Sequence, residues 1–419
     1  MNIACYGPAG KPGTPHGSSF VSANYLLLQY LLVQGHTITR FGFQEDAPDL
    51  AAYPNYRYVT VDATAGWTGR LAEWGKQTWF PQHSNAGLYG LANRLWGGFR
   101  SATQEQALAR IVQQYHRQQP FTLLFFWGLP AVFQVPGLPT VAWLQGPFHT
   151  EMATIQRLKA EIVHYCGPTE YWKLHIFYTL RLLTVRRVAA RPQLSLVPSQ
   201  WSRQEAIAWG MPPDRIQVLP YPIDLETFRP QPPQPTARFR LLWLGRIIPR
   251  KRLDLLMAAL ALLAAERQDV VLQIVGGFAY GFGYRQCLER FPYPEMVEYC
   301  EGVTHGEVVA LLQACDAIVQ PSESENYGSA IAEGLACGRP VIAGPTNGTL
   351  DYAGEAAYRF AEYTPASLKA TLAFAIDDIR AHREARNLAA RQAAETHLHP
   401  QIVGDRLIAL LGSRPIPSP

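Results

Sequence analysis

The feature that most constrains the fold of this chain is the alternation of short apolar runs with longer segments of helical period. The short runs are rich in apolar and β-branched residues and are bounded by Gly and Pro, which is typical of buried strands. Strands that alternate with helices in this way form a parallel sheet covered by crossover helices. The sequence therefore predicts an α/β fold.

The alternation occurs twice. Near the start, a strand at residues 3–6, a helix at 18–34 and a strand at 37–42 make one βαβ unit. From Arg238 onward the pattern predicts strands at 239–245, 270–275, 317–320 and 341–343, and helices at 253–267, 306–315 and 327–336. Two parallel sheets of similar size are therefore expected, one in each half of the chain.

A cluster of prolines separates the two halves. The prolines of this cluster are Pro220, Pro222, Pro230, Pro232, Pro233 and Pro235. Proline neither continues a helix nor sits inside a sheet, so this stretch favours an interdomain linker. We divide the chain into an N-terminal domain at 1–222, a linker at 223–237, a C-terminal domain at 238–395, and a C-terminal helix and tail at 396–419.

Charge and cysteine spacing exclude several classes of protein. The 37 Lys and Arg exceed the 33 Asp and Glu by too little for a typical nucleic-acid binder, so no nucleic-acid partner is expected. Six scattered cysteines, with no Cys-x-x-Cys pair, argue against a structural zinc site and a secreted disulfide framework. The N-terminus lacks the pattern of a signal peptide, and no apolar run reaches the ~20 residues of a membrane span. A cytoplasmic protein is expected.

The sharpest local signal lies between Pro321 and Ile342. A predicted strand ends just before this segment, a short loop carries Glu325, and a helix that begins near Tyr327 carries Glu333 two turns later. In open α/β sheets, ligands bind at the carboxyl ends of the strands, and helix N-termini at that edge favour anions. We expect Glu325 to lie at such a ligand-binding edge.

This segment resembles the signature of the retaining GT-B glycosyltransferases of family 4, which use nucleotide-sugar donors. Glu325 and Glu333 match the Glu-x7-Glu pattern, and Tyr327-Gly328 stands where Phe-Gly is commoner. The resemblance implies that Glu325 lies by the donor sugar and that Glu333 holds the ribose hydroxyls, with Asn326, Tyr327 and Gly328 also at the donor. Ionised carboxylates suit these roles because they accept hydrogen bonds from vicinal hydroxyls in pairs.

A second match follows the predicted strand at 239–245. Gly245-Arg246 and the downstream Lys251 resemble the family's Gly-Arg and Lys, whose cations hold the donor diphosphate. The resemblance implies that Arg246 and Lys251 neutralise the leaving group, a role otherwise filled by a divalent metal. Because no Asp-x-Asp occurs in the chain, we expect no metal and no other cofactor. In the alternative interpretation Lys251 is only part of a charged helix start.

Weaker correspondences add four residues to the predicted site. Gly276 and Gly277 follow the strand at 270–275, and Gly17 precedes the first helix in a turn that resembles the family's Gly-rich loop beside the phosphates. His149 resembles the family's His near the reacting sugar, although Gln145-Gly146-Pro147 separates it from its strand. An ordinary loop histidine is the alternative.

The resemblance implies two Rossmann-like domains that face a central cleft. The C-terminal domain would hold the nucleoside diphosphate sugar and the N-terminal domain a hydroxyl acceptor, which could be a saccharide, a lipid-linked molecule or a small molecule. The implied reaction is hexosyl transfer with retention at the anomeric carbon, in glycolipid, polysaccharide or other glycoconjugate synthesis. The alternatives are a GT-B nucleotide-sugar epimerase or phosphorylase, or a non-catalytic nucleotide-sugar binding subunit.

Residues 171–191 mix large apolar side chains with five cations. The cations are Lys173, Arg181, Arg186, Arg187 and Arg191. A helix with such a basic face is compatible with peripheral contact to an anionic bilayer, as found in several enzymes of the family. The alternative is an ordinary amphipathic crossover helix with a solvated basic face.

Overall fold

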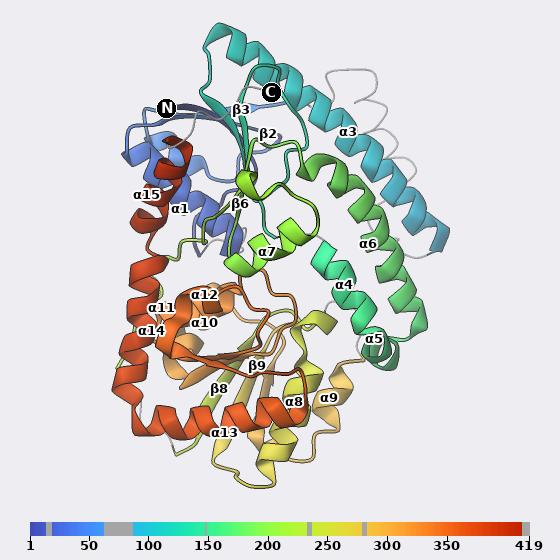
Figure 1. Cartoon of the computed structure of the whole chain (residues 1–419), viewed down its shortest axis with the longest axis vertical. Coiled ribbons are helices and arrows are strands. Elements are labelled where there is room, and N and C mark those ends of the chain that lie inside the picture. Colours follow the sequence, from blue (N-terminus) through green and yellow to red (C-terminus); the bar gives the residue numbers. More distant parts are fainter. Residues whose placement is uncertain (14–18, 63–86, 147–148, 233–236, 279–282, 413–419) are drawn as a thin grey trace.

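The computed structural model describes the chain except for residues 14–18, 63–86, 147–148, 233–236, 279–282 and 413–419; side chains at 19, 87–102, 184 and 187 are also not described. It contains two parallel sheets, each covered by helices, in two domains that lie one above the other in Figure 1. The α/β fold with two sheets, predicted from the alternation of elements, is confirmed.

The N-terminal domain is built on a seven-stranded sheet in the order β3-β2-β1-β4-β5-β6-β7. Its strands are β1 (Asn2–Tyr6), β2 (Thr37–Gly42), β3 (Tyr56–Thr60), β4 (Leu123–Trp127), β5 (Thr140–Trp143), β6 (Leu194–Val197) and β7 (Ile216–Val218). Neighbouring strands run parallel. The central strands β4 and β5 are buried along their whole length, as expected when helices cover both faces of a parallel sheet.

The helices of this domain include three that reach toward the other domain. The helices are α1 (Ser19–Val33), α3 (Gly87–Gln118), α4 (His149–Arg157), α5 (Lys159–Cys166), α6 (Pro168–Ala189) and α7 (Gln200–Ala208), with short 3-10 turns η1 (Pro48–Ala52) and η2 (Pro213–Arg215). In Figure 1, α4 descends to α5 beside the lower domain and α6 returns upward. This excursion places α4 against the C-terminal domain.

The C-terminal domain has a six-stranded sheet in the order β10-β9-β8-β11-β12-β13. Its strands are β8 (Phe239–Leu244), β9 (Val270–Val275), β10 (Val297–Cys300), β11 (Ala317–Gln320), β12 (Val341–Ala343) and β13 (Ala357–Arg359). Its helices are α8 (Leu253–Ala264), α9 (Arg285–Glu289), α10 (His305–Ala314), α11 (Ser329–Ala336), α12 (Leu350–Ala353), α13 (Pro365–Ala381) and α14 (Arg383–His397), with 3-10 turns η3 (Pro249–Lys251), η4 (Pro294–Met296) and η5 (Gly354–Ala356). Strands β8 and β11 are adjacent, so the loops that follow them meet at one edge.

Several predicted bounds agree with the structure. Strands β2, β9, β11 and β12 begin and end at the predicted residues. The predicted helix at 327–336 begins two residues later, as α11, because Gly328 at its N-cap has a left-handed backbone with φ of 81°. The chain therefore turns sharply between the end of β11 and the start of α11.

The first part of the proline-rich stretch is packed, whereas residues 229–232 are exposed. The side chains of Tyr221, Ile223, Leu225 and Phe228 are buried, and the Ile223 amide donates to the Leu398 carbonyl over 2.9 Å. Proline keeps the stretch out of helix and sheet, but the apolar residues between the prolines still bury their surface. The first residues of the predicted linker therefore belong to the core.

The last helices cross back to the N-terminal domain. Helix α15 (Pro400–Gly412) packs on α1, where the Tyr30 hydroxyl donates to the Asp405 carboxylate. A Cβ atom at Gly404 would lie 2.1 Å from Cδ1 of Tyr30. The two helices can therefore pack this closely because Gly404 has no side chain. Figure 1 shows α14 and α15 running along one side of both domains.

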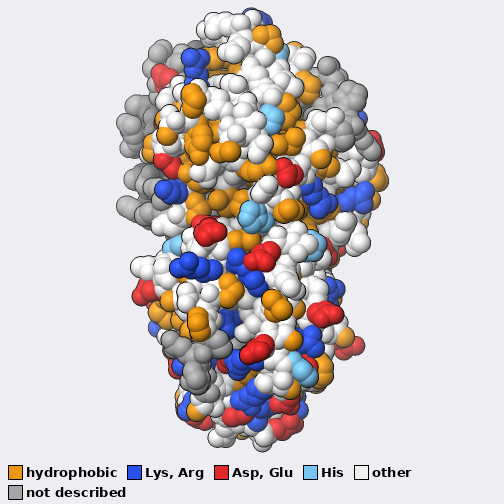
Figure 2. Space-filling model, turned by 90° about the vertical axis from the view of Figure 1, so that its left-hand side faces the viewer, with side chains coloured by type: hydrophobic (Ala, Val, Ile, Leu, Met, Phe, Trp, Pro, Cys, Tyr) orange, Lys and Arg blue, Asp and Glu red, His pale blue; other side chains and the backbone are white. Residues whose placement is uncertain are grey.

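The two domains differ in surface character on the side where α14 and α15 lie. On this face, shown in Figure 2, charged side chains gather mainly over the lower, C-terminal domain, while hydrophobic and uncharged ones prevail above. Within the part of the chain that the structure describes, no helix has the length and apolar character needed to cross a membrane.

Candidate active site

A cavity of about 600 Å³ lies where the two domains meet. The N-terminal domain lines it with Phe20, Gln145, Gly146, Glu151, Tyr178 and Arg181, and the remaining lining residues are Tyr221, Leu244, Gly245, Arg246, Arg250, Lys251, Glu325, Asn326, Tyr327, Gly328, Ser329, Ala330 and Glu333. Apart from Tyr221, which follows β7, the second group lies at the end of β8, in the loops after β8 and β11, and in the first two turns of α11. The cavity therefore lies at the carboxyl edge of the C-terminal sheet, where the sequence predicts the site.

The loop after β8 packs closely against the backbone of the residues that follow β9. Gly276, just after β9, approaches Gly245 so closely that a Cβ atom at Gly276 would lie 1.8 Å from the Gly245 carbonyl oxygen. The Gly277 carbonyl accepts a hydrogen bond from the Ile247 amide over 2.8 Å. Gly276 and Gly277, predicted at the donor, do not line the cavity and instead support Gly245, which does.

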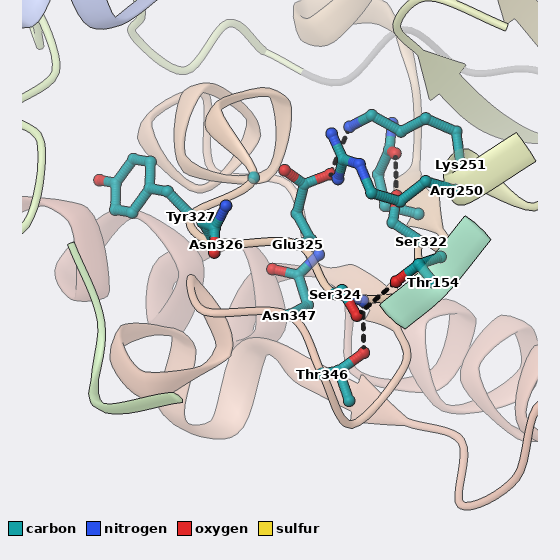
Figure 3. Close-up of polar contacts among 12 residues, drawn as sticks. Thr154, Arg250, Lys251, Ser322, Ser324, Glu325, Asn326, Tyr327, Thr346 and Asn347 are labelled. Carbon is teal, nitrogen blue, oxygen red and sulfur yellow. Dashed lines mark hydrogen bonds and ion pairs between the residues drawn. The ribbon is translucent and has the colours of Figure 1, made fainter. Parts of the chain in front are cut away.

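Glu325 lies in the loop between β11 and α11, where two cations contact its carboxylate. Oε2 of its carboxylate accepts from Lys251 Nζ over 2.5 Å and from Arg250 Nη1 over 2.9 Å, and Figure 3 shows both cations pointing at it. Burial raises the pKa of Glu325, but Arg250 and Lys251 outweigh it and lower the pKa to about 2. Glu325 is therefore ionised at neutral pH.

The two predicted cations, Arg246 and Lys251, line the same cavity but differ in burial and in ion pairing. Burial, with Arg250 close by, lowers the pKa of Lys251 although Glu325 opposes the shift. Arg246 is exposed, and no ion pair of its guanidinium is found among the described residues. An anion that enters the cavity therefore meets an open cation at Arg246 and a cation already paired at Lys251.

Glu333 and its neighbours frame the other side of the cavity. Glu333 lies in the second turn of α11 and is half-buried. The Asn326 carbonyl accepts from Ser199 and Ser202, and a Cβ atom at Gly146 would overlap the Asn326 side chain, so the two domains touch here.

Tyr327 and Gly328, both predicted at the donor, line the cavity chiefly through their position in the turn. The Tyr327 hydroxyl donates to the Tyr221 carbonyl over 2.6 Å, and the buried ring points away from Glu325 in Figure 3. Burial raises the pKa of Tyr327 well above its usual value. Its side chain therefore anchors the turn to the proline-rich stretch.

His149 lies apart from the residues that line the cavity. It begins α4, stacks on Trp209 with ring centroids 5.2 Å apart, and has Nε2 3.3 Å from a carboxylate oxygen of Glu205. Burial lowers the pKa of His149, and Glu205 opposes this shift. Gly17, also predicted at the donor, lies outside the described residues.

Residues 224–394 match the protein family described as glycosyl transferases group 1. The D-inositol 3-phosphate glycosyltransferase of Frankia alni is 34% identical over 154 residues, which cover 32% of this chain and 38% of that relative. The enzyme of the same name from Thermomonospora curvata is 28% identical over 227 residues, covering 48% and 53%. The chain thus spans about a third to a half of the length of these curated relatives.

Solved glycosyltransferase structures match the chain over nearly all its length. Sucrose-phosphate synthase from Thermosynechococcus elongatus has a TM-score of 0.67 at 16% identity and covers 98% of both chains. WaaG, a glycosyltransferase involved in lipopolysaccharide biosynthesis, has a TM-score of 0.61 at 16% identity and covers 98% of this chain and all of its own. Anabaena HepE, in complex with UDP and glucose, has a TM-score of 0.60 at 16% identity. The predicted GT-B fold is confirmed.

The residues predicted from sequence supply most of the cavity wall in the C-terminal domain, but sequence reasoning missed several lining residues, among them Arg250 and Glu151. Arg250 directly precedes Lys251, and Glu151 lies two positions after His149. The run of three cations at 250–252 was a visible signal for Arg250. Its contact with Glu325 crosses 75 residues of sequence and leaves no local pattern.

The described part of the chain contains no group of three or more His, Cys, Asp or Glu side chains that could hold a metal ion. The charged groups at the cavity are instead carboxylates and cations in contact. Glu325 pairs with Lys251 and Arg250, and Arg250 also pairs with Glu151.

Proposed function

We propose that this protein is a glycosyltransferase that moves a hexose-type residue from a nucleoside diphosphate sugar to a hydroxyl acceptor, with retention at the anomeric carbon. The observation that carries the proposal is the single cavity that gathers Arg246 and Lys251 after β8 with Glu325 and Glu333 around α11. Cations suit a diphosphate and carboxylates suit sugar hydroxyls. The family match of residues 224–394 supports the same function.

Each of these residues takes a role that follows from its place. Glu333 accepts hydrogen bonds from the ribose hydroxyls, and Arg246 and Lys251 bind the diphosphate together with the amino end of α11. Glu325 lies by the transferred sugar. The acceptor binds against the N-terminal wall of the cavity, which Gln145, Glu151, Tyr178 and Arg181 form.

The reaction is a front-face displacement. The acceptor oxygen forms a bond to the anomeric carbon as the bond from that carbon to the phosphate oxygen breaks, and the leaving phosphate takes the acceptor proton. Arg246 and Lys251 offset the negative charge that develops on the diphosphate, and Glu325 stabilises positive charge on the sugar. We expect turnover to continue in excess EDTA, because these cations supply the charge that a metal would otherwise bring.

The first experiment is a thermal-shift screen with UDP-, GDP- and ADP-sugars. A ligand at ~100 times its dissociation constant adds roughly 2.7 kcal/mol to stability, which such a screen detects. The donor found is then incubated with saccharide, lipid-linked and small-molecule acceptors, with and without EDTA, and the anomeric configuration of the product is determined by NMR. Loss of activity in EDTA that only Mg²⁺ or Mn²⁺ restores would contradict the role of Arg246 and Lys251.

The same screen separates the alternatives. A nucleotide sugar altered without any acceptor would indicate an epimerase, and a lysine-bound pyridoxal phosphate would indicate a phosphorylase. Donor binding without turnover across all acceptors would indicate a binding subunit. A transferred sugar in a new glycosidic bond is the outcome expected here.

We further propose that α6 contacts an anionic bilayer. Five large apolar side chains of α6 are exposed by 38% to 61%, namely Trp172, Ile176, Phe177, Leu180 and Leu183. Exposed apolar patches of this kind mark interaction surfaces, and Trp favours the membrane interface. Lys173 and Arg186 are exposed on the same helix and complement anionic headgroups.

This surface differs from the basic face expected from sequence, because apolar side chains make up most of it and the cations flank them. Tyr178 and Arg181 of the same helix line the cavity. A bilayer on the apolar stripe would bring membrane-anchored acceptors close to that wall of the cavity.

A further inference from the structure

One face of α4 crosses from the N-terminal domain to the loops that carry the donor-site residues. Glu151 and Thr154, three positions apart, lie on this face. Oε1 of Glu151 is 3.2 Å from Nε of Arg250, and the Thr154 hydroxyl donates to the Ser324 hydroxyl over 2.8 Å. Figure 3 shows Thr154 reaching the loop next to Glu325. The N-terminal domain, which forms the acceptor side of the cavity and is called the acceptor-side domain below, therefore touches both loops that form the donor side.

Arg250 joins this helix to Glu325. Its guanidinium lies between two carboxylates, with Nε 3.2 Å from Glu151 and Nη1 2.9 Å from Glu325. Its carbonyl oxygen accepts a hydrogen bond from the Glu323 amide over 2.8 Å, which fixes the backbone as well. A planar guanidinium with five donors can bridge two carboxylates at once, whereas a lysine ammonium acts as a point charge.

Lys251 contacts the same carboxylate oxygen of Glu325 as Arg250 does. A donor diphosphate that enters the cavity competes with Glu325 for the Lys251 ammonium. Glu325 is only 8% exposed, and a buried carboxylate without a cation is costly. Glu325 therefore needs a second partner that the donor does not draw away, and Arg250, held by Glu151, is so placed.

We propose that Arg250 is a positioning residue that holds the Glu325 carboxylate in place while Lys251 binds the donor diphosphate, and that Glu151 of the acceptor-side domain holds Arg250 in turn. This inference rests on the proposed function, because it takes Glu325 and Lys251 as donor-site residues. If so, the acceptor-side domain helps to hold the donor-site carboxylate in place through the ion pair between Glu151 and Arg250.

The test compares Arg250→Gln, Arg250→Lys and Glu151→Gln with wild type. The matched control is Arg157→Gln, which removes a contact of α4 to Ser324 and Glu323 but leaves Glu325 untouched. Turnover and Michaelis constants are measured across pH, and calorimetry gives the affinity for whichever of UDP, GDP and ADP binds wild type most tightly. Thermal unfolding checks that each variant folds.

We expect Arg250→Gln to lower kcat at least about tenfold, since hydrogen bonds to charged groups are of that size. Glu325 loses one of the two cations that lower its pKa, so the carboxylate becomes protonated at a higher pH. The decrease of kcat at acid pH should therefore begin at a higher pH than in wild type. The nucleoside diphosphate also binds more weakly, because Glu325 then depends on Lys251 alone.

The other variants separate charge from orientation. Arg250→Lys should keep the acid-side fall near its wild-type pH and recover part of kcat. Glu151→Gln should lower kcat without raising the pH at which kcat falls on the acid side, because Glu325 keeps both of its cations. Arg157→Gln should keep the wild-type kcat and pH profile.

Wild-type kcat, pH profile and diphosphate affinity in Arg250→Gln would overturn the inference while leaving the proposed function intact. Equal losses in Arg157→Gln and Arg250→Gln would also overturn it, because the effect would then belong to interdomain contact in general. If Arg250→Gln does not fold, Arg250→Lys and Glu151→Gln decide the same question. A wild type that neither binds a nucleoside diphosphate nor transfers a sugar would instead contradict the proposed function.

Discussion

Two cations share one oxygen of Glu325, and this arrangement governs how the carboxylate responds to acid. The pKa of Glu325 in the folded protein is about 2, against an ordinary value of 4.5, because Arg250 and Lys251 outweigh the effect of burial. A carboxylate whose pKa is lowered by folding stabilises the fold above its unfolded pKa. That contribution is lost as pH falls from about 4.5 toward 2.

We therefore predict that Glu325→Gln loses less stability than wild type over this acid range. At neutral pH the variant should be less stable, because Arg250 and Lys251 keep their burial but lose their counter-charge. Thermal unfolding of both proteins from pH 7 down to the acid limit of solubility measures the difference. Parallel curves for the two proteins would show that Glu325 is not held by its cations.

A second prediction concerns how Glu333 and Glu325 differ in function. Glu333→Gln should raise the Michaelis constant for every sugar donor with the same nucleotide, because the ribose is bound in ground and transition states alike. Glu325→Gln should lower kcat more than affinity, because charge on the sugar develops only in the transition state. Steady-state kinetics with two donors of one nucleotide measure both effects, and normal kinetics in both folded variants would contradict these roles.

Local spacing made some of these residues predictable and others not. Glu325 and Glu333 lie in one loop and the helix that follows it, so their spacing carries the signal. Arg250 contacts Glu325 across a distance in sequence that no local pattern encodes. His149 fits the order of strand, turn and histidine, but it begins α4 and packs on Trp209 instead of the cavity.

At the scale of helices and strands, the parallel sheets were predictable because buried strands need continuous apolar runs. Strands β9 and β11 are apolar along most of their length and bounded by turn residues, so their bounds follow from sequence. Helix α15 was predictable as a helix but not in its packing. Its Gly404 faces Tyr30, nearly the whole chain away in sequence.

We predict that Gly404→Ala destabilises the protein by about 1–3 kcal/mol, the usual effect of an extra methyl group in a packed interface. The added Cβ would lie 2.1 Å from Cδ1 of Tyr30, so the Tyr30 ring or one of the two helices must shift. Gly412→Ala is the matched control, because nothing lies within 4 Å of a Cβ atom there. Denaturant unfolding compares the two variants.

The cause is tested by adding Tyr30→Ala to Gly404→Ala. Removal of the ring makes room for the methyl group, so the double variant should lose less stability than the two single losses added together. Strict additivity would mean that Gly404 matters for a reason other than its contact with Tyr30.

At the scale of the whole molecule, the apolar stripe on α6 predicts binding to membranes. We expect the wild type to sediment with anionic vesicles and to be released partly by salt, because apolar burial and headgroup attraction act together. A triple variant with Trp172, Leu180 and Leu183 changed to Ser should lose most of this binding. Co-sedimentation at low and at physiological salt measures it.

The matched control for this prediction carries Ser at Phe374 and Leu388, which are equally exposed but lie on α13 and α14. It should bind vesicles as wild type does. Replacing the flanking cations Lys173 and Arg186 by Gln should weaken binding at low salt and leave the salt-resistant part. A wild type that does not sediment, or a triple variant that matches it, would contradict a membrane-facing role for α6.

The packing of α15 on α1 also determines when the surface of α1 is covered during synthesis of the chain. Helix α1 leaves the ribosome long before α15 does, and its partner surface exists only after residues 400–412 have been made. The N-terminal domain can form its sheet during translation, yet this face of α1 stays open until α15 has been made. A nascent chain stalled before α15 would therefore expose Tyr30 and the apolar surface around it to chaperones, and the packing of α15 on α1 would cover this surface.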